Sequence, residues 1–126
     1  MLTKLALIGI GGGVGAVIRY IMGYTILSML SNNLQYGFIS TFCINILACF
    51  CIGICMALLH DNSSLLYAFF VVGILGGFST FSTLSLEVFK LLQSGFVFVG
   101  IGYILFSNIF GVLFVWLGYS MQTKIL

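Results

Sequence analysis

The stretch Gly73-Ile74-Leu75-Gly76-Gly77-Phe78-Ser79-Thr80-Phe81-Ser82-Thr83-Leu84-Ser85 places three glycines and a run of hydroxyl side chains inside a strongly apolar chain. Five of the seven residues from Ser79 to Ser85 carry hydroxyls. Inside a bilayer, a backbone polar group without a partner costs several kcal/mol, so such a stretch is tolerated only where it faces protein or a water-filled cavity. This stretch is therefore predicted to form the functional site of the protein.

The overall composition indicates a membrane protein. The chain has 126 residues, of which 62% are hydrophobic, with only four basic and two acidic side chains. A soluble domain of this size carries far more charge on its surface, so the surface is expected to face lipid. The length leaves no room for a second domain, and residues 1–126 are predicted to form one transmembrane domain.

Two classes of function are excluded by what the chain lacks. The net charge of +2 and the absence of a basic patch argue against a nucleic-acid partner. The single His, single Asp and single Glu fall in different parts of the sequence, so no base and orienting partner stand ready for a nucleophile. The protein is not expected to be an enzyme.

Four segments are long and apolar enough to cross a bilayer, which takes about 20 residues in a helix. They cover approximately residues 5–30, 38–59, 65–92 and 96–121, joined by short polar links at 31–35, 60–64 and 93–95. Such short links make sequential helices antiparallel neighbours. The chain contains no proline, so a break within the third helix must come from glycine and hydroxyl residues. The predicted fold is an all-α bundle of four transmembrane helices.

The charged residues give only a weak preference for one orientation in the membrane. With an even number of spans both termini lie on one side, together with Lys4 and Lys124, while Lys90 lies near the other side. Orientation follows the excess of Lys and Arg in the flanking loops, which here amounts to about one residue. Oppositely inserted copies can then pair as an antiparallel dimer; alternatively, one lysine is enough to orient every copy. Four short helices enclose little volume, which also favours an oligomer.

Several glycine pairs have the four-residue spacing that lets membrane helices approach closely. They are Gly9 and Gly13, Gly11 and Gly15, and Gly73 and Gly77. These pairs are expected to support close contacts between helices.

Two polar residues interrupt the apolar segments. Arg19 lies inside the first span, where its charge either attracts anions into a vestibule or snorkels to the interface. Asn45 lies inside the second span, with Thr41 one turn earlier on nearly the same face. Its amide can donate two hydrogen bonds, either to a passing anion or to a neighbouring helix.

Phe78, Phe81 and Leu84 recur every three residues through the hydroxyl-rich stretch. Such a stripe is most often packing against a neighbouring helix. The edge of a phenyl ring carries partial positive charge, so the rings can instead face an anion.

Three segments resemble a known family, the small fluoride channels called Fluc or CrcB. Residues 73–87 resemble its pattern G-x-x-G-G-x-T-T-F-S-T-F-S-x-E, and residues 12–20 are similar to its G-G-x-x-G-A-x-x-R-Y start. Residues 40–45, Ser-Thr-Phe-Cys-Ile-Asn, resemble its G-T-L-x-V-N segment. The segments occur in the family's order, each in the corresponding span, and together cover nearly the whole chain.

The resemblance implies a passive, fluoride-selective channel that rejects chloride and exports fluoride through two pores in an antiparallel, dual-topology dimer. It places the protein in a cell membrane as a multi-pass protein, in the inner or plasma membrane of a bacterium. It also implies a third helix broken near residues 76–80, whose Gly76 and Ser79 backbone carbonyls hold a central structural sodium ion. Arg19 becomes a vestibule residue, and the expected fluoride pathway comprises Thr41, Asn45, Phe78, Phe81, Ser82, Thr83 and Leu84.

The chain departs from the family pattern at two positions in this stretch. Ser79 replaces a threonine, a mild change if the ligand is its backbone carbonyl. Leu84 replaces the second phenylalanine, so either one half-site is weakened or a paralogous partner supplies the ring in a heterodimer.

Two rival functions are weighed against the channel. A small proton-coupled multidrug antiporter of dual topology also has four spans, but it needs a membrane-embedded acid, and the first two spans contain none. A purely structural membrane subunit would leave the hydroxyl run and Asn45 without a role.

Overall fold

The computed structural model describes residues 1–30, 37–59 and 61–125, and this part of the chain is almost entirely helical. It contains four segments long and apolar enough to cross a membrane. They are α1 (Leu2–Met29), α2 (Gly37–Leu58), a composite third segment (Leu65–Gln93) and α6 (Val97–Ile125). The predicted four-helix membrane architecture is confirmed. The link predicted at 31–35 and His60 lie outside the described residues.

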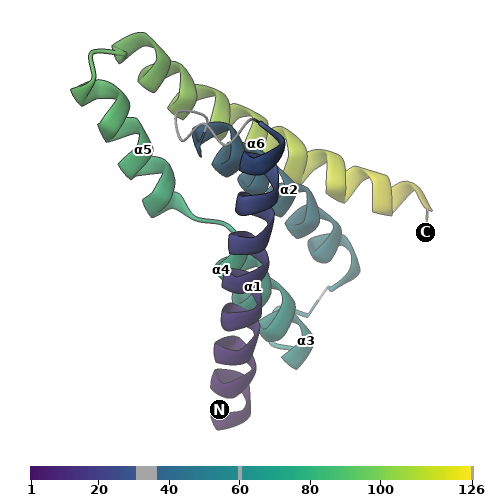
Figure 1. Cartoon of the computed structure of the whole chain (residues 1–126). Helices are drawn as coiled ribbons and strands as arrows, with labels where there is room; N and C mark the ends of the chain where they lie inside the picture. The colour runs from purple at the N-terminus through teal and green to yellow at the C-terminus, as the bar shows by residue number, and fades with distance from the viewer. Residues whose placement is uncertain (31–36, 60, 126) are drawn as a thin grey trace.

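The third segment is broken where the glycines give way to hydroxyl residues. It begins as α3 (Leu65–Tyr67), widens into a π-helix, η2 (Ala68–Leu75), and ends its first half as α4 (Gly76–Phe78). Ser79 and Thr80 are extended, with ψ angles of 153° and 113°, before α5 (Phe81–Gln93) begins. In Figure 1, α5 leaves the direction of α4 after this break and turns back into α6 at its far end. The break predicted near residues 76–80 is confirmed.

A hydroxyl side chain starts α5 after the break. The first N–H groups of a helix have no partner within the helix, and a Ser or Thr at the preceding position can accept from one of them. Thr80 does so, its Oγ1 accepting from the Thr83 N–H at 3.4 Å. In this chain, which contains no proline, the Thr80 side chain thus caps the start of α5 directly after the break.

Close backbone contacts hold the first half of the third segment against α1. A Cβ atom at Gly77 would clash with the carbonyl oxygen of Gly12, and one at Gly15 would clash with the carbonyl oxygen of Ile74. A Cβ at Gly11 would clash with the carbonyl oxygen of Phe69, and one at Gly73 would lie only 3.1 Å from the Gly11 Cα, so the predicted close packing of these two pairs is confirmed. The pair Gly9 and Gly13 differs, because a Cβ added at either position would meet nothing within 4 Å. That side of α1 is open.

The second contact layer joins α2 to α6 through aromatic rings. Phe42 packs edge-to-face against Phe110, and Phe50 packs in the same way against Phe114, with ring centroids 6.2 and 6.4 Å apart. Near the start of α2, Phe38 meets Tyr103 at 5.7 Å. These pairs hold α6 against α2. Figure 1 shows the ribbons of α2 and α6 alongside one another.

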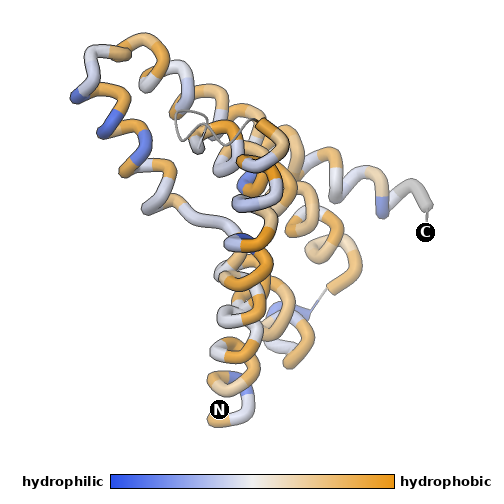
Figure 2. The backbone as a smooth tube through the Cα atoms, in the orientation of Figure 1, coloured by the Kyte–Doolittle hydropathy of each residue, from blue (hydrophilic) through white to orange (hydrophobic). Residues whose placement is uncertain are grey.

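The surface of the bundle is apolar around nearly all of its helices. Figure 2 shows hydrophobic residues on every helix, with hydrophilic ones gathered mainly along α5 and at the connections. Two small clusters form the interior, one around Ile44, Ala48 and Phe78, the other around Leu84, Val88 and Tyr103. Since a bilayer solvates apolar side chains, such a surface suits a multi-pass membrane protein.

Candidate functional site

A polar groove of about 430 Å³ lies between α1, α2 and the start of α5. Its lining combines one guanidinium, one carboxylate and several hydroxyls, contributed by Arg19, Ser40, Thr41, Thr80, Thr83 and Glu87. Three residues predicted from the sequence, Arg19, Thr41 and Thr83, thus meet in one place. Tyr20 and Tyr24 of α1 also line it. We call this feature the polar groove.

Within the described residues, Arg19 shares the polar groove with one carboxylate, Glu87, and forms no ion pair with it. Glu87 accepts hydrogen bonds from Thr41 and Tyr103, and Asp61 accepts from Ser63 in a connection far along the sequence. The Glu87 carboxylate lines the same groove as Arg19, and its two oxygens accept hydrogen bonds from hydroxyl groups. The groove thus holds one positive and one negative side chain, and the potential that attracts anions belongs to its Arg19 side.

Asn45 holds the break in the third segment. Its Oδ1 accepts from the Thr80 N–H at 2.9 Å, and its Nδ2 donates to the Thr80 carbonyl at 3.4 Å. One amide thus satisfies both backbone groups of an extended residue within a membrane-spanning region, where leaving them unpaired would be costly. The amide has a second N–H beyond this pair. Inter-helix bonding, one of the two interpretations of Asn45, is observed, and its role toward an anion stays a prediction.

The same arrangement frees two backbone carbonyls. In an uninterrupted helix the Thr80 N–H would donate to Gly76 and the Thr83 N–H to Ser79. Here these N–H groups donate to Asn45 and to the Thr80 hydroxyl instead. Among the backbone hydrogen bonds that the described residues form in turns, loops and helix caps, none has the Gly76 or the Ser79 carbonyl as its acceptor. These are the two carbonyls to which the family resemblance assigns a cation.

Two residues that were not predicted from the sequence complete the site: Glu87 lines the polar groove, and Tyr103 binds its carboxylate. The Thr41 hydroxyl donates to Glu87 Oε1 at 2.8 Å, and the Tyr103 hydroxyl donates to Glu87 Oε2 at 2.9 Å. Glu87 is the last residue of the family pattern and the one acid in the third span, and these two facts could have identified it as a site residue. For Tyr103 no local signal existed, because its position depends on how α6 folds back beside α5.

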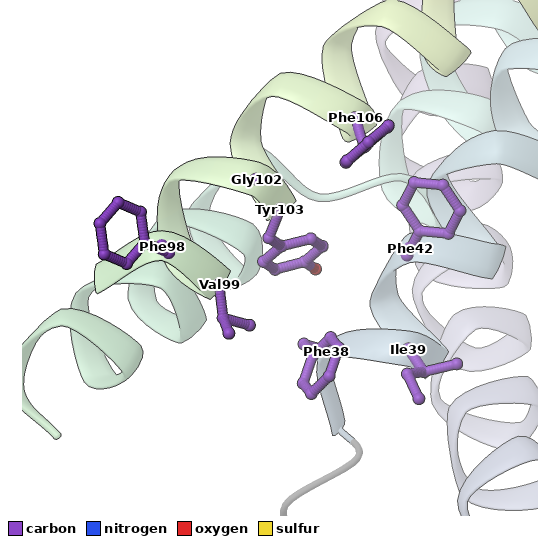
Figure 3. Close-up of a pocket in the computed structure, with 8 residues that line it drawn as sticks. All are labelled: Phe38, Ile39, Phe42, Phe98, Val99, Gly102, Tyr103 and Phe106. Carbon is purple, nitrogen blue, oxygen red and sulfur yellow. The ribbon is translucent and has the colours of Figure 1, made fainter. Parts of the chain in front are cut away.

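An aromatic hollow of about 390 Å³ lies on the other side of this cluster, between the starts of α2 and α6. Its walls include Phe38, Phe42, Phe106 and Tyr103, drawn as sticks in Figure 3. The figure shows the Tyr103 ring between the two helices. Tyr103 therefore lines the hollow while its hydroxyl binds the carboxylate that lines the polar groove.

The predicted aromatic stripe does not stay on one face. Phe78 is buried against Ile44 and Ala48, and Leu84 is buried against Val88 and Tyr103. Phe81, in contrast, is 76% exposed, and its neighbour Ser82 is also exposed. Packing within the chain accounts for Phe78 and Leu84. Phe81 and Ser82 point away from the chain's own core.

Comparison with known proteins gives concordant matches over nearly the full length. Residues 6–119 match the family described as CrcB-like protein, Camphor Resistance (CrcB). A protein of Azobacteroides pseudotrichonymphae named fluoride-specific ion channel FluC is 40% identical, the match covering 96% of this chain and 97% of the relative. One of the same name from Phocaeicola vulgatus is 38% identical, covering 96% and 99%. A third, fluoride-specific ion channel FluC 2 of Nocardia farcinica, is 40% identical over 79% and 71%.

Proposed function

Because this chain belongs to the CrcB-like family, which consists of ion channels and not enzymes, we propose that it is a fluoride-selective channel that exports fluoride passively. Four apolar spans make it a multi-pass membrane protein, and its relatives carry fluoride in their names. The observation in the structure that supports the proposal best is the polar groove. It offers an anion the guanidinium of Arg19, which forms no ion pair among the described residues, together with several hydroxyl side chains.

The pathway is completed by a second copy of the chain. Phe81 is 76% exposed beside the exposed hydroxyls of Ser82 and Ser85, and this mixed surface is unsuited to lipid. An antiparallel partner would cover it and place its own copy of this surface against the first chain. A pathway that lies off the two-fold axis occurs twice in such a dimer, which gives two pores. The partner is either an identical chain or a paralogue.

A structural sodium ion fits the break in the third segment. Hard cations bind oxygen ligands, and the Gly76 and Ser79 carbonyls lose their helical partners to Asn45 and Thr80. A bound sodium would supply positive charge that offsets the charge of nearby anions. Replacing sodium by N-methylglucamine during purification is expected to weaken the dimer, measured as a shift to monomer in gel filtration. An unchanged dimer in sodium-free buffer argues against the ion.

The decisive experiment is ion efflux from liposomes containing the purified chain. Fluoride efflux far above chloride efflux is expected, with no proton-driven movement of an organic cation. Equal fluoride and chloride efflux contradicts the channel's selectivity. Proton-coupled cation transport would instead support the antiporter hypothesis, in which Glu87 is the one acid within a span.

A further inference from the structure

Ser40 is a buried hydroxyl on the wall of the polar groove. It belongs to α2, is only 7% exposed, and lines the groove beside Thr41. A buried hydroxyl needs a hydrogen-bond partner, and the identity of that partner decides its role.

The partner within the chain is a weak one. The Ser40 hydroxyl donates to the Gly23 carbonyl at 3.4 Å, whereas hydrogen bonds between two oxygens are usually about 2.7–2.8 Å long. Gly23 lies inside α1, so its carbonyl already accepts from the N–H four residues later in the helix. The Gly23 carbonyl therefore keeps a hydrogen-bond donor when the Ser40 hydroxyl rotates away from it. A serine hydroxyl rotates freely to reach a better acceptor.

The other hydroxyls that line the groove have partners of their own. Thr41 donates to the Glu87 carboxylate at 2.8 Å. Thr80 Oγ1 lies 3.2 Å from Thr83 Oγ1 and accepts the Thr83 N–H. Ser40 is thus a buried donor in the polar groove whose proton can be given to a ligand without breaking a strong bond.

We infer that Ser40 is an anion-coordinating residue that donates its hydroxyl to fluoride in the polar groove, where α2 meets α1, the helix that carries Arg19. This inference rests on the proposed function. Arg19 draws the anion into the groove by its charge. Ser40 then replaces part of the water shell of the anion with a short O–H hydrogen bond, which is the interaction that a small, strongly hydrated halide requires.

The test compares Ser40→Ala with Ser40→Thr over a series of fluoride concentrations in liposomes. Removing one donor is expected to slow efflux roughly fivefold at low fluoride. The rate should approach that of the wild type at saturating fluoride. Ser40→Thr keeps the hydroxyl and is expected to restore the low-fluoride rate. If Ser40 served only to join α1 to α2, Ser40→Ala would lower the melting temperature of the purified protein, and the dependence of efflux on fluoride concentration would not change.

The outcomes separate this inference from the function on which it rests. If the wild-type chain moves no fluoride, the proposed function fails. If the wild type conducts and Ser40→Ala has the same concentration dependence, the inference about Ser40 is wrong and the channel stands. Should Ser40→Ala not yield folded protein, Ser40→Cys takes its place, since it keeps the volume and offers only a weak donor. An unchanged rate in Ser40→Cys then overturns the inference.

Discussion

Asn45 and Thr80, which lie 35 positions apart, are joined by two hydrogen bonds between one side-chain amide and both backbone groups of one residue. The pair connects the middle of α2 to the point where the third segment breaks. It lets an extended backbone exist at membrane depth without unpaired groups, and it leaves the Gly76 carbonyl free of its helical partner.

Replacing Asn45 by Asp tests this pair. The carboxylate can still accept from the Thr80 N–H, but it cannot donate to the Thr80 carbonyl and places a negative charge beside it. Fluoride efflux from liposomes is expected to fall at least about tenfold, since leaving a buried acceptor unsatisfied costs about 1–3 kcal/mol. Asn108→Asp is the matched control, because that amide donates only to Ile104 within α6 and its side chain is exposed. Wild-type efflux in the Asn45 variant would remove Asn45 from the pathway.

Two glycines on α1 provide a matched pair for the packing of the bundle. A Cβ at Gly15 would clash with the backbone of Ile74, whereas a Cβ at Gly13 would meet nothing within 4 Å. Gly15→Ala is expected to lower the stability of the purified protein by about 1–3 kcal/mol, the usual cost of overpacking. Gly13→Ala should leave stability within the single chain unchanged. Both effects are measured by thermal unfolding in detergent, and equal melting temperatures for the two variants would contradict the close contact between α1 and the first half of the third segment.

Leu84→Phe asks whether this position limits the pathway. Leu84 is 4% exposed and packs against Val88 and Tyr103. A phenyl ring supplies the positive edge that an aliphatic side chain lacks, so fluoride throughput or selectivity is expected to rise. Overpacking costs about 1–3 kcal/mol, so thermal unfolding and gel filtration first establish that the variant folds and dimerises. Leu86→Phe, at an exposed position of the same helix, is the control. Robust wild-type flux that Leu84→Phe leaves unchanged would show that the position does not limit the pathway.

Dual topology is tested by adding charge at either end of the bundle. Asn62→Lys with Thr3→Lys adds positive charge beside Lys4, and Gln93→Lys with Ser94→Lys adds it beside Lys90. Because the original bias is about one residue, each double variant should insert in one orientation only. Each is expected to lose fluoride efflux alone and to regain it when both are co-expressed. Full activity of either variant alone would refute the antiparallel dimer, and Asn62→Gln with Ser94→Asn serves as the neutral control.

Much of the site could be predicted because its elements are local. Glycines and hydroxyl residues break an apolar helix, and the unpaired backbone groups at such a break carry a free-energy cost in the bilayer. The position of the break therefore follows from residues 73–85 alone. Arg19 and Asn45 were visible for the same reason, as polar groups in apolar spans. The roles of Glu87 and Tyr103 were not visible, because their hydrogen bond depends on where α6 returns beside α5.

The sequence by itself determined the four apolar spans, the break in the third and the family to which the chain belongs. A helix crosses a bilayer only if it is apolar over about 20 residues, and each unpaired backbone group in the bilayer is costly. Both the apolar length and the residues that break the helix can be read from consecutive positions of the sequence. Only the tertiary structure decided that Asn45 pairs with Thr80, that Leu84 is buried while Phe81 is exposed, and that Ser40 lines the polar groove. These facts depend on the angle at which α5 leaves the break and on the contacts of separate helices, which no single stretch of sequence contains.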